Sequence, residues 1–86
     1  MEKSSIEISR FLELSTSVII PMLCRPEFDK YKYGTKYKIN LDFVNEIDKY
    51  LEMKKIAREY TRKKFQKAQK KLYQWKRRLA AQKAVF

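Results

Sequence analysis

The sequence predicts an all-α fold, a helical hairpin built from a short N-terminal helix and a long basic C-terminal helix. Apolar residues recur at spacings of three and four from Ile8 to Met22, which is the period of one buried helix face. Residues 41–83 contain neither Pro nor Gly and are rich in strong helix formers. With 86 residues, the chain can form one small domain.

The first helix is expected over about residues 5–20. Ser4 and Glu7 fit a capping box, in which each side chain accepts a hydrogen bond from the other residue's backbone N–H. Pro21 is expected to end or kink this helix near Ile20, because its ring removes a donor and clashes with the preceding turn.

The connection that follows breaks the helical pattern over residues 24–39. Tyr and Lys alternate on both sides of Gly34-Thr35, and a Gly-X pair can form the two-residue turn of a β-hairpin. The connection is therefore either a small β-hairpin near 30–33 and 36–39 or a Tyr/Lys-rich loop. Its tyrosines either form a second contact with nucleic acid or lie across the helices as a lid.

The second helix is expected over about residues 41–83, with Asn40 as its N-cap. A helix of that length extends about 60 Å, and the first helix is too short to cover it. The sequence therefore predicts one small domain over 1–86. In it, residues 1–60 form a neutral hairpin core and residues 61–86 form a basic protruding helix.

Positive charge is concentrated in the second half of the chain. The sequence has 21 Lys and Arg against 10 Asp and Glu, a net charge of +11. Residues 1–50 carry 8 basic and 8 acidic side chains, whereas residues 51–86 carry 13 basic side chains against Glu52 and Glu59. This asymmetry indicates an anionic partner for the second half: nucleic acid, a membrane surface or an acidic protein.

A pattern of two cations followed by one apolar residue recurs every seven residues, at 63–65, 70–72 and 77–79. On a helix this pattern aligns the apolar residues in a seam with cations on both sides. A homodimeric coiled coil is disfavoured, because basic flanking positions would face basic ones in either orientation. The predicted partner seam consists of Phe65, Leu72, Trp75, Leu79 and Phe86.

Two functions fit this pattern, and the first is nucleic-acid binding or nucleoprotein assembly. Cations along a helix can contact phosphates, and exposed aromatic rings can stack on unpaired bases of RNA or single-stranded DNA. The alternative is a protein-interaction subunit that docks its amphipathic basic helix on an acidic partner, with the seam as anchor and the cations as rim. The predicted nucleic-acid contacts are Lys63, Lys64, Lys67, Lys70, Lys71, Lys76, Arg77 and Arg78, with Tyr73 and Trp75 as the stacking residues.

Several function classes are not expected. The chain has no His and one cysteine, Cys24, so we expect no disulfide within the chain, no metal site and no cofactor. No glycine-rich phosphate loop and no nucleophile paired with a base is present, so an enzyme is not expected. The longest apolar run, residues 18–23, is too short to span a bilayer, and a membrane partner is not expected. Without a secretory signal, we expect an intracellular location, either the cytoplasm or the interior of a host cell.

Overall fold

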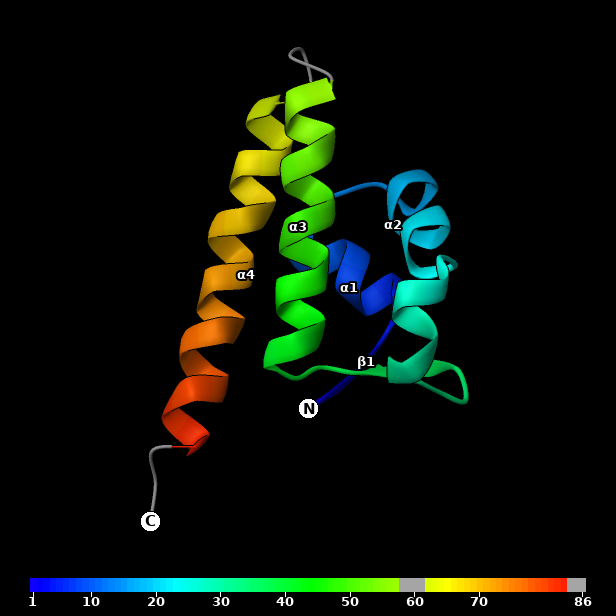
Figure 1. Ribbon diagram of the computed structural model, residues 1–86, viewed down its shortest axis with the longest axis vertical. Helices are drawn as coiled ribbons and strands as arrows, with labels where there is room; N and C mark the ends of the chain where they lie inside the picture. The colour runs from blue at the N-terminus through cyan, green and yellow to red at the C-terminus, as the bar shows by residue number, and fades with distance from the viewer. Residues whose placement is uncertain (58–61, 84–86) are drawn as a thin grey trace.

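The computed structural model describes residues 1–57 and 62–83. The fold is mostly helical with a small three-stranded sheet. Figure 1 shows the last two helices side by side as an antiparallel pair, with the first two helices and the sheet packed on one side of this pair. In chain order the elements are β1 (Glu2–Ser4), α1 (Ser5–Leu12), α2 (Thr16–Leu23), the 3-10 helix η1 (Pro26–Tyr31), β2 (Lys32–Tyr33), β3 (Lys36–Lys38), α3 (Leu41–Ala57) and α4 (Arg62–Lys83).

The capping box predicted at the start of α1 is present. The backbone N–H of Glu7 donates to Ser4 Oγ at 3.2 Å, and the backbone N–H of Ser4 donates to Glu7 Oε1 at 3.1 Å. These bonds satisfy two backbone donors that a helix N-terminus otherwise leaves without a partner.

The prediction of one helix over residues 5–20 is wrong. α1 ends at Leu12, because Glu13 adopts a left-handed conformation with φ of 56°. Ser9 stabilises this break: its carbonyl accepts from the backbone N–H of Leu14 at 3.1 Å, and its hydroxyl donates to the carbonyl of Leu14. Pro21 lies inside α2 and is exposed, and the helix continues past it to Leu23. The missing N–H costs one hydrogen bond, which burial of neighbouring apolar residues of α2 offsets.

Of the two predicted connections, the β-hairpin is present. β2 and β3 pair antiparallel with Tyr33 opposite Lys36, and Gly34 takes the positive φ of 64° that the turn requires. The sheet also has a strand that the sequence did not predict. β1 pairs with β3, with Lys3 opposite Tyr37, so β3 is the central strand.

The prediction of a single helix over residues 41–83 is also wrong. Asn40 caps α3 as predicted, since its Oδ1 accepts from the backbone N–H of Phe43 at 2.8 Å. The chain then forms two antiparallel helices (Figure 1), and residues 58–61, expected in the middle of the long helix, lie outside the described residues. When α4 folds back on α3, its apolar residues are removed from water. This burial stabilises the fold by about 25 cal/mol for each Å² of apolar surface. A protruding helix would leave those residues exposed.

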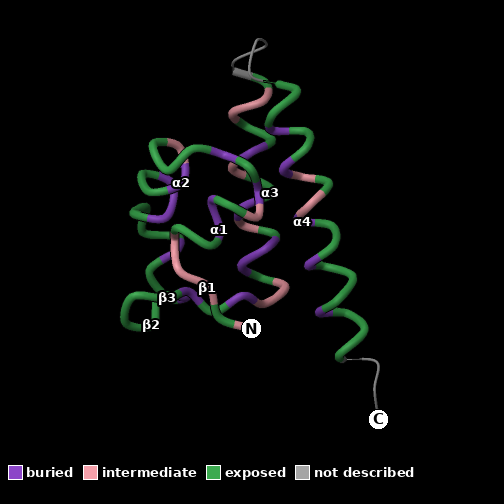
Figure 2. The backbone as a smooth tube through the Cα atoms, turned by 180° about the vertical axis from the view of Figure 1, so that it is seen from behind, coloured by how far each residue is buried: buried purple, intermediate pink, exposed green. Residues whose placement is uncertain are grey.

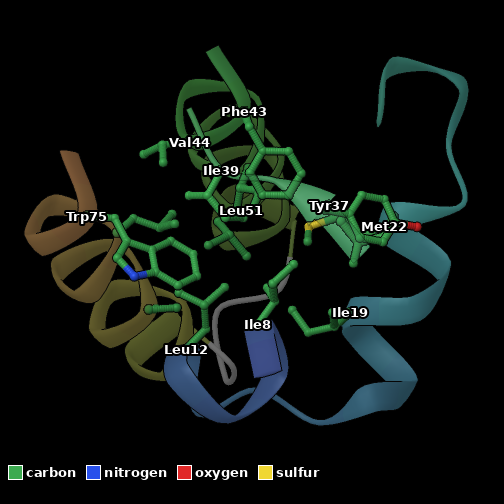
Figure 3. Packing of buried hydrophobic residues seen from close by; sticks show 14 of the residues in the cluster. Ile8, Leu12, Ile19, Met22, Tyr37, Ile39, Phe43, Val44, Leu51 and Trp75 are labelled. Atoms are coloured by element: carbon green, nitrogen blue, oxygen red, sulfur yellow. The ribbon is translucent and has the colours of Figure 1, made fainter. Parts of the chain in front are cut away.

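α4 therefore belongs to the core and does not protrude from it. Figure 3 shows the Trp75 indole directed into a cluster that contains Leu12 of α1 and Leu51 of α3. In Figure 2 the buried positions recur along α4, with exposed positions between them. The structure does not divide the chain into a core over 1–60 and a separate basic helix, because one buried cluster runs through both parts. α4 contributes Phe65, Ala68, Leu72, Trp75 and Leu79 to it.

We predict that Leu72→Ala lowers the free energy of unfolding by about 2–5 kcal/mol, because it removes a buried side chain and leaves a cavity. The matched control is Tyr73→Ala on the same helix, where the side chain is 60% exposed and the change should stay within about 0.5 kcal/mol. Urea unfolding followed by circular dichroism measures both. Equal stabilities of the two variants would contradict the packing of α4 described above.

Candidate nucleic-acid interface

The apolar seam of α4 faces the interior of the protein. Trp75 is 4% exposed, and its ring stacks on that of Phe11 in α1, with centroids 4.1 Å apart and ring planes at 6°. Trp75 is therefore not open to a nucleic-acid base, which corrects its predicted stacking role. The predicted partner seam is corrected as well, because Phe65, Leu72 and Leu79 are buried with it. The fifth seam residue, Phe86, lies outside the described residues.

The outer face of α4 carries cations along its length. Seven of the eight cations predicted to bind phosphate are exposed: Lys63, Lys64, Lys67, Lys70, Lys76, Arg77 and Arg78. At about 100° per residue, four of these point most directly away from the buried face. We call these four the outer stripe: Lys63, Lys67, Lys70 and Arg77. The stripe covers about 21 Å of helix at 1.5 Å per residue, and none of its members forms an ion pair with another described residue.

The eighth cation, Lys71, is engaged within the protein. Its Nζ lies 3.0 Å from Glu13 Oε2 and 5.9 Å from the centre of the Phe11 ring. The hydrogen bond and the charge of Lys71 hold the pKa of the Glu13 carboxyl below its usual value. Lys71 therefore fastens α4 to the end of α1, and a phosphate would have to compete with Glu13 for it.

Carboxylates of α3 border the other flank of α4. Gln69 Nε2 donates to Asp48 Oδ1 at 3.1 Å and to Glu52 Oε2 at 2.9 Å. Lys55 Nζ lies 3.0 Å from the same Glu52 oxygen and donates to Gln69 Oε1 at 3.3 Å. The hydrogen bond from Gln69, followed by that from Lys55, lowers the pKa of Glu52. A polyanion on the outer stripe thus meets negative charge on its α3 side.

The Tyr/Lys segment does not extend the outer stripe. Tyr31 and Tyr37 are buried against Phe43, with ring centroids at 5.2 Å and 6.0 Å, so these two lie in the core as the lid alternative expected. Tyr33 at the hairpin turn is 74% exposed. Figures 1 and 2 place β2 and β3 on the opposite side of the molecule from α4.

Tyr73 is the exposed aromatic residue beside the outer stripe. It lies between Lys70 and Arg77 in sequence, on the flank of α4 where it lines a hollow with Asp48 of α3, and 60% of its surface is accessible. An exposed ring flanked by cations can stack on a nucleic-acid base while its neighbours contact the backbone. Of the two predicted stacking residues, Tyr73 is the one that the structure leaves accessible.

Sequence reasoning missed a basic side chain that the fold brings to α4. Arg10 of α1 is exposed and lines the same hollow as Arg78. The two residues are 68 positions apart, and Arg10 belongs to the half of the chain whose charges balance. No local pattern could have linked them, because the packing of α1 on α4 creates the proximity.

The described parts of the chain, 1–57 and 62–83, hold no group of three or more His, Cys, Asp or Glu side chains arranged to bind a metal ion. Among the helices in these ranges, none has the length and apolar character needed to cross a membrane. Comparisons of the chain with protein-family models, curated proteins and solved structures found no match.

The carboxyl groups of Glu7, Glu13 and Glu52 all have pKa values below the ordinary 4.5, and the largest cause is a hydrogen bond from Ser4, Lys71 and Gln69 respectively. A depressed folded-state pKa contributes stability above the unfolded-state value, which is lost as pH falls through the folded-state value. We predict that the urea midpoint falls as pH drops from about 5 to about 3, and that Glu13→Gln makes this fall shallower. A midpoint that rises over this interval would contradict the prediction.

Proposed function

We propose that the protein binds nucleic acid, or assembles into a nucleoprotein, through the outer face of α4. The observation that carries this proposal is the separation of the two faces of the helix. The apolar residues pack inside the protein, while seven cations and Tyr73 are exposed to solvent.

This separation favours phosphate over an acidic protein groove as the partner. Protein interfaces obtain most of their affinity from a few buried apolar or aromatic anchors, and rim charges contribute mainly to the association rate. On α4 the candidate anchors are part of the core, so docking through the seam would require the protein to open. The cations that remain suit a partner whose recognition is electrostatic.

The outer stripe also has a geometry suited to a phosphate backbone. Its four cations lie along one side of a helix for about 21 Å and have no carboxylate partner within the described residues. Each phosphate neutralised by such a cation releases counterions, which supplies sequence-independent affinity that falls with salt. The proposed role is binding rather than catalysis. The proposed location is inside the cell, where nucleic acid is found.

We predict that replacing Lys63, Lys67, Lys70 and Arg77 together by Gln reduces affinity on the order of 100-fold at about 100 mM salt. The slope of log affinity against log salt should fall by about 0.7–0.9 for each phosphate that the variant no longer neutralises. Fluorescence anisotropy with labelled single-stranded RNA, single-stranded DNA and duplex DNA measures both quantities. Absence of binding by the unaltered protein to all three, even at about 50 mM salt, would refute the proposed function.

The matched control removes four charges elsewhere, by replacing Lys30, Lys32, Lys38 and Lys49 by Gln. The first three lie on and beside the hairpin, on the opposite side of the molecule from α4 (Figures 1 and 2), and Lys49 of α3 lines a hollow with Lys30. Salt screens interactions beyond about 10 Å at 0.1 M, so this variant should bind nucleic acid almost as tightly as the unaltered protein. If both variants are weakened by the same amount, net charge governs binding and the assignment to α4 is wrong.

Glu13→Gln is predicted to increase affinity for nucleic acid, by up to about fivefold, because it frees Lys71 from an exposed ion pair. The salt slope should become steeper at the same time, since one more cation is available to phosphate. Glu27→Gln serves as control, because Glu27 forms a comparable 3.0 Å pair with Arg25 at the start of η1. An unchanged affinity of the Glu13 variant would show that Lys71 takes no part in binding.

A further inference from the structure

A hollow of about 310 Å³ opens between α1 and α4 near the last cations of the outer stripe. Its walls come from segments far apart in the sequence: the chain start through β1 and α1, and the second half of α4. Met1, Lys3, Glu7, Arg10, Phe11, Trp75 and Arg78 line it.

The charges around the hollow are unbalanced. Lys3 Nζ lies 3.8 Å from Glu7 Oε2, so these two side chains largely neutralise each other. Arg10 and Arg78 are both exposed, and neither forms an ion pair with another described residue. Two arginine residues thus line one hollow, and Glu7, the carboxylate that lines it with them, is paired with Lys3. The unbalanced positive charge favours an anion in the hollow.

The framework of the hollow is fixed by packing on α1 and α4. The Phe11 and Trp75 rings stack at 4.1 Å, and one turn earlier in α4 the Lys71–Glu13 ion pair joins α4 to the residue that follows α1. Because these interactions hold the helices together, the backbone positions of Arg10 and Arg78 are set before any ligand binds. Such preorganisation reduces the entropy lost on binding.

We propose that this hollow binds one phosphate group of the nucleic-acid strand that lies along α4, with Arg10 and Arg78 donating hydrogen bonds to its oxygens. The planar guanidinium fork matches the geometry of phosphate oxygens, and charge-assisted bonds of this kind are stronger than neutral ones. Arg78 directly follows Arg77, the last member of the outer stripe, so a strand on the stripe can continue into the hollow. The inference rests on the proposed function and adds α1 to the binding surface.

The test begins with Arg10→Gln, measured by anisotropy with the labelled single strand that the unaltered protein binds best. Affinity should fall about tenfold at about 100 mM salt. The salt slope should fall by about 0.7–0.9 only when Arg78 is replaced as well, because either arginine alone can neutralise the shared phosphate. The matched control is Lys49→Gln, which removes one charge from an exposed residue of α3 that lines a different hollow with Lys30 and Tyr31. This variant should bind like the unaltered protein.

A double-mutant cycle then tests whether Arg10 and Arg78 share one phosphate. If they do, Arg78→Gln alone should weaken binding by a similar factor, and the double variant should be weakened by clearly less than the product of the two single effects. Effects that multiply would mean separate phosphates and would overturn the shared site. Urea unfolding of each variant separates weaker binding from loss of folded protein.

The outcomes also separate this inference from the proposed function. If the unaltered protein binds nucleic acid but Arg10→Gln behaves like Lys49→Gln, the hollow is not a phosphate site and the proposal for the outer stripe stands. If the unaltered protein binds no nucleic acid, both fail together.

Discussion

The packing of the apolar stripe of α4 against α1 and α3 determines the rest of this structure. Phe65, Leu72 and Trp75 lie in one cluster with residues of the N-terminal helices, and the ring of Trp75 stacks on Phe11. In a domain of 86 residues, little apolar surface is available for a core. Once these apolar residues of α4 are buried, the helix can rotate very little about its axis. The cations between them in sequence are then held toward solvent.

The same packing explains where the positive charge is balanced and where it is not. Glu13 at the end of α1 pairs with Lys71, and the carboxylates of Asp48 and Glu52 border the opposite flank through Gln69. The outer stripe receives no such partner among the described residues. Like charges along one helix face repel one another, which destabilises the folded state. An anionic ligand that binds this face of the folded protein should stabilise it by mass action. On the proposed function, binding and folding would therefore be coupled through α4.

Local interactions were predictable from the sequence, whereas changes of chain direction were not. The cap formed by Ser4 and Glu7 and the turn at Gly34 depend on residues within a few positions, and both are present. The break at Glu13 is stabilised by hydrogen bonds between Ser9 and Leu14 and places Leu14 in the core, and α3 and α4 pair through residues more than a dozen positions apart. For the candidate interface, the exposure of most α4 cations was predictable, because the helical period places them on faces other than the apolar one. Arg10 was not, because tertiary packing brings it near Arg78.

The seven-residue repeat of two cations and one apolar residue serves two surfaces of one helix. An apolar seam has the same period whether it packs on the chain's own core or on a separate partner, so the pattern alone could not distinguish these cases. The distinction comes from tertiary packing, in which α3 and α4 lie antiparallel and bury their apolar positions in one cluster. With its apolar positions buried, the repeat presents cations alone to an external ligand. A phosphate backbone, which needs positive charge at intervals and no apolar groove, fits such a surface better than a protein helix does.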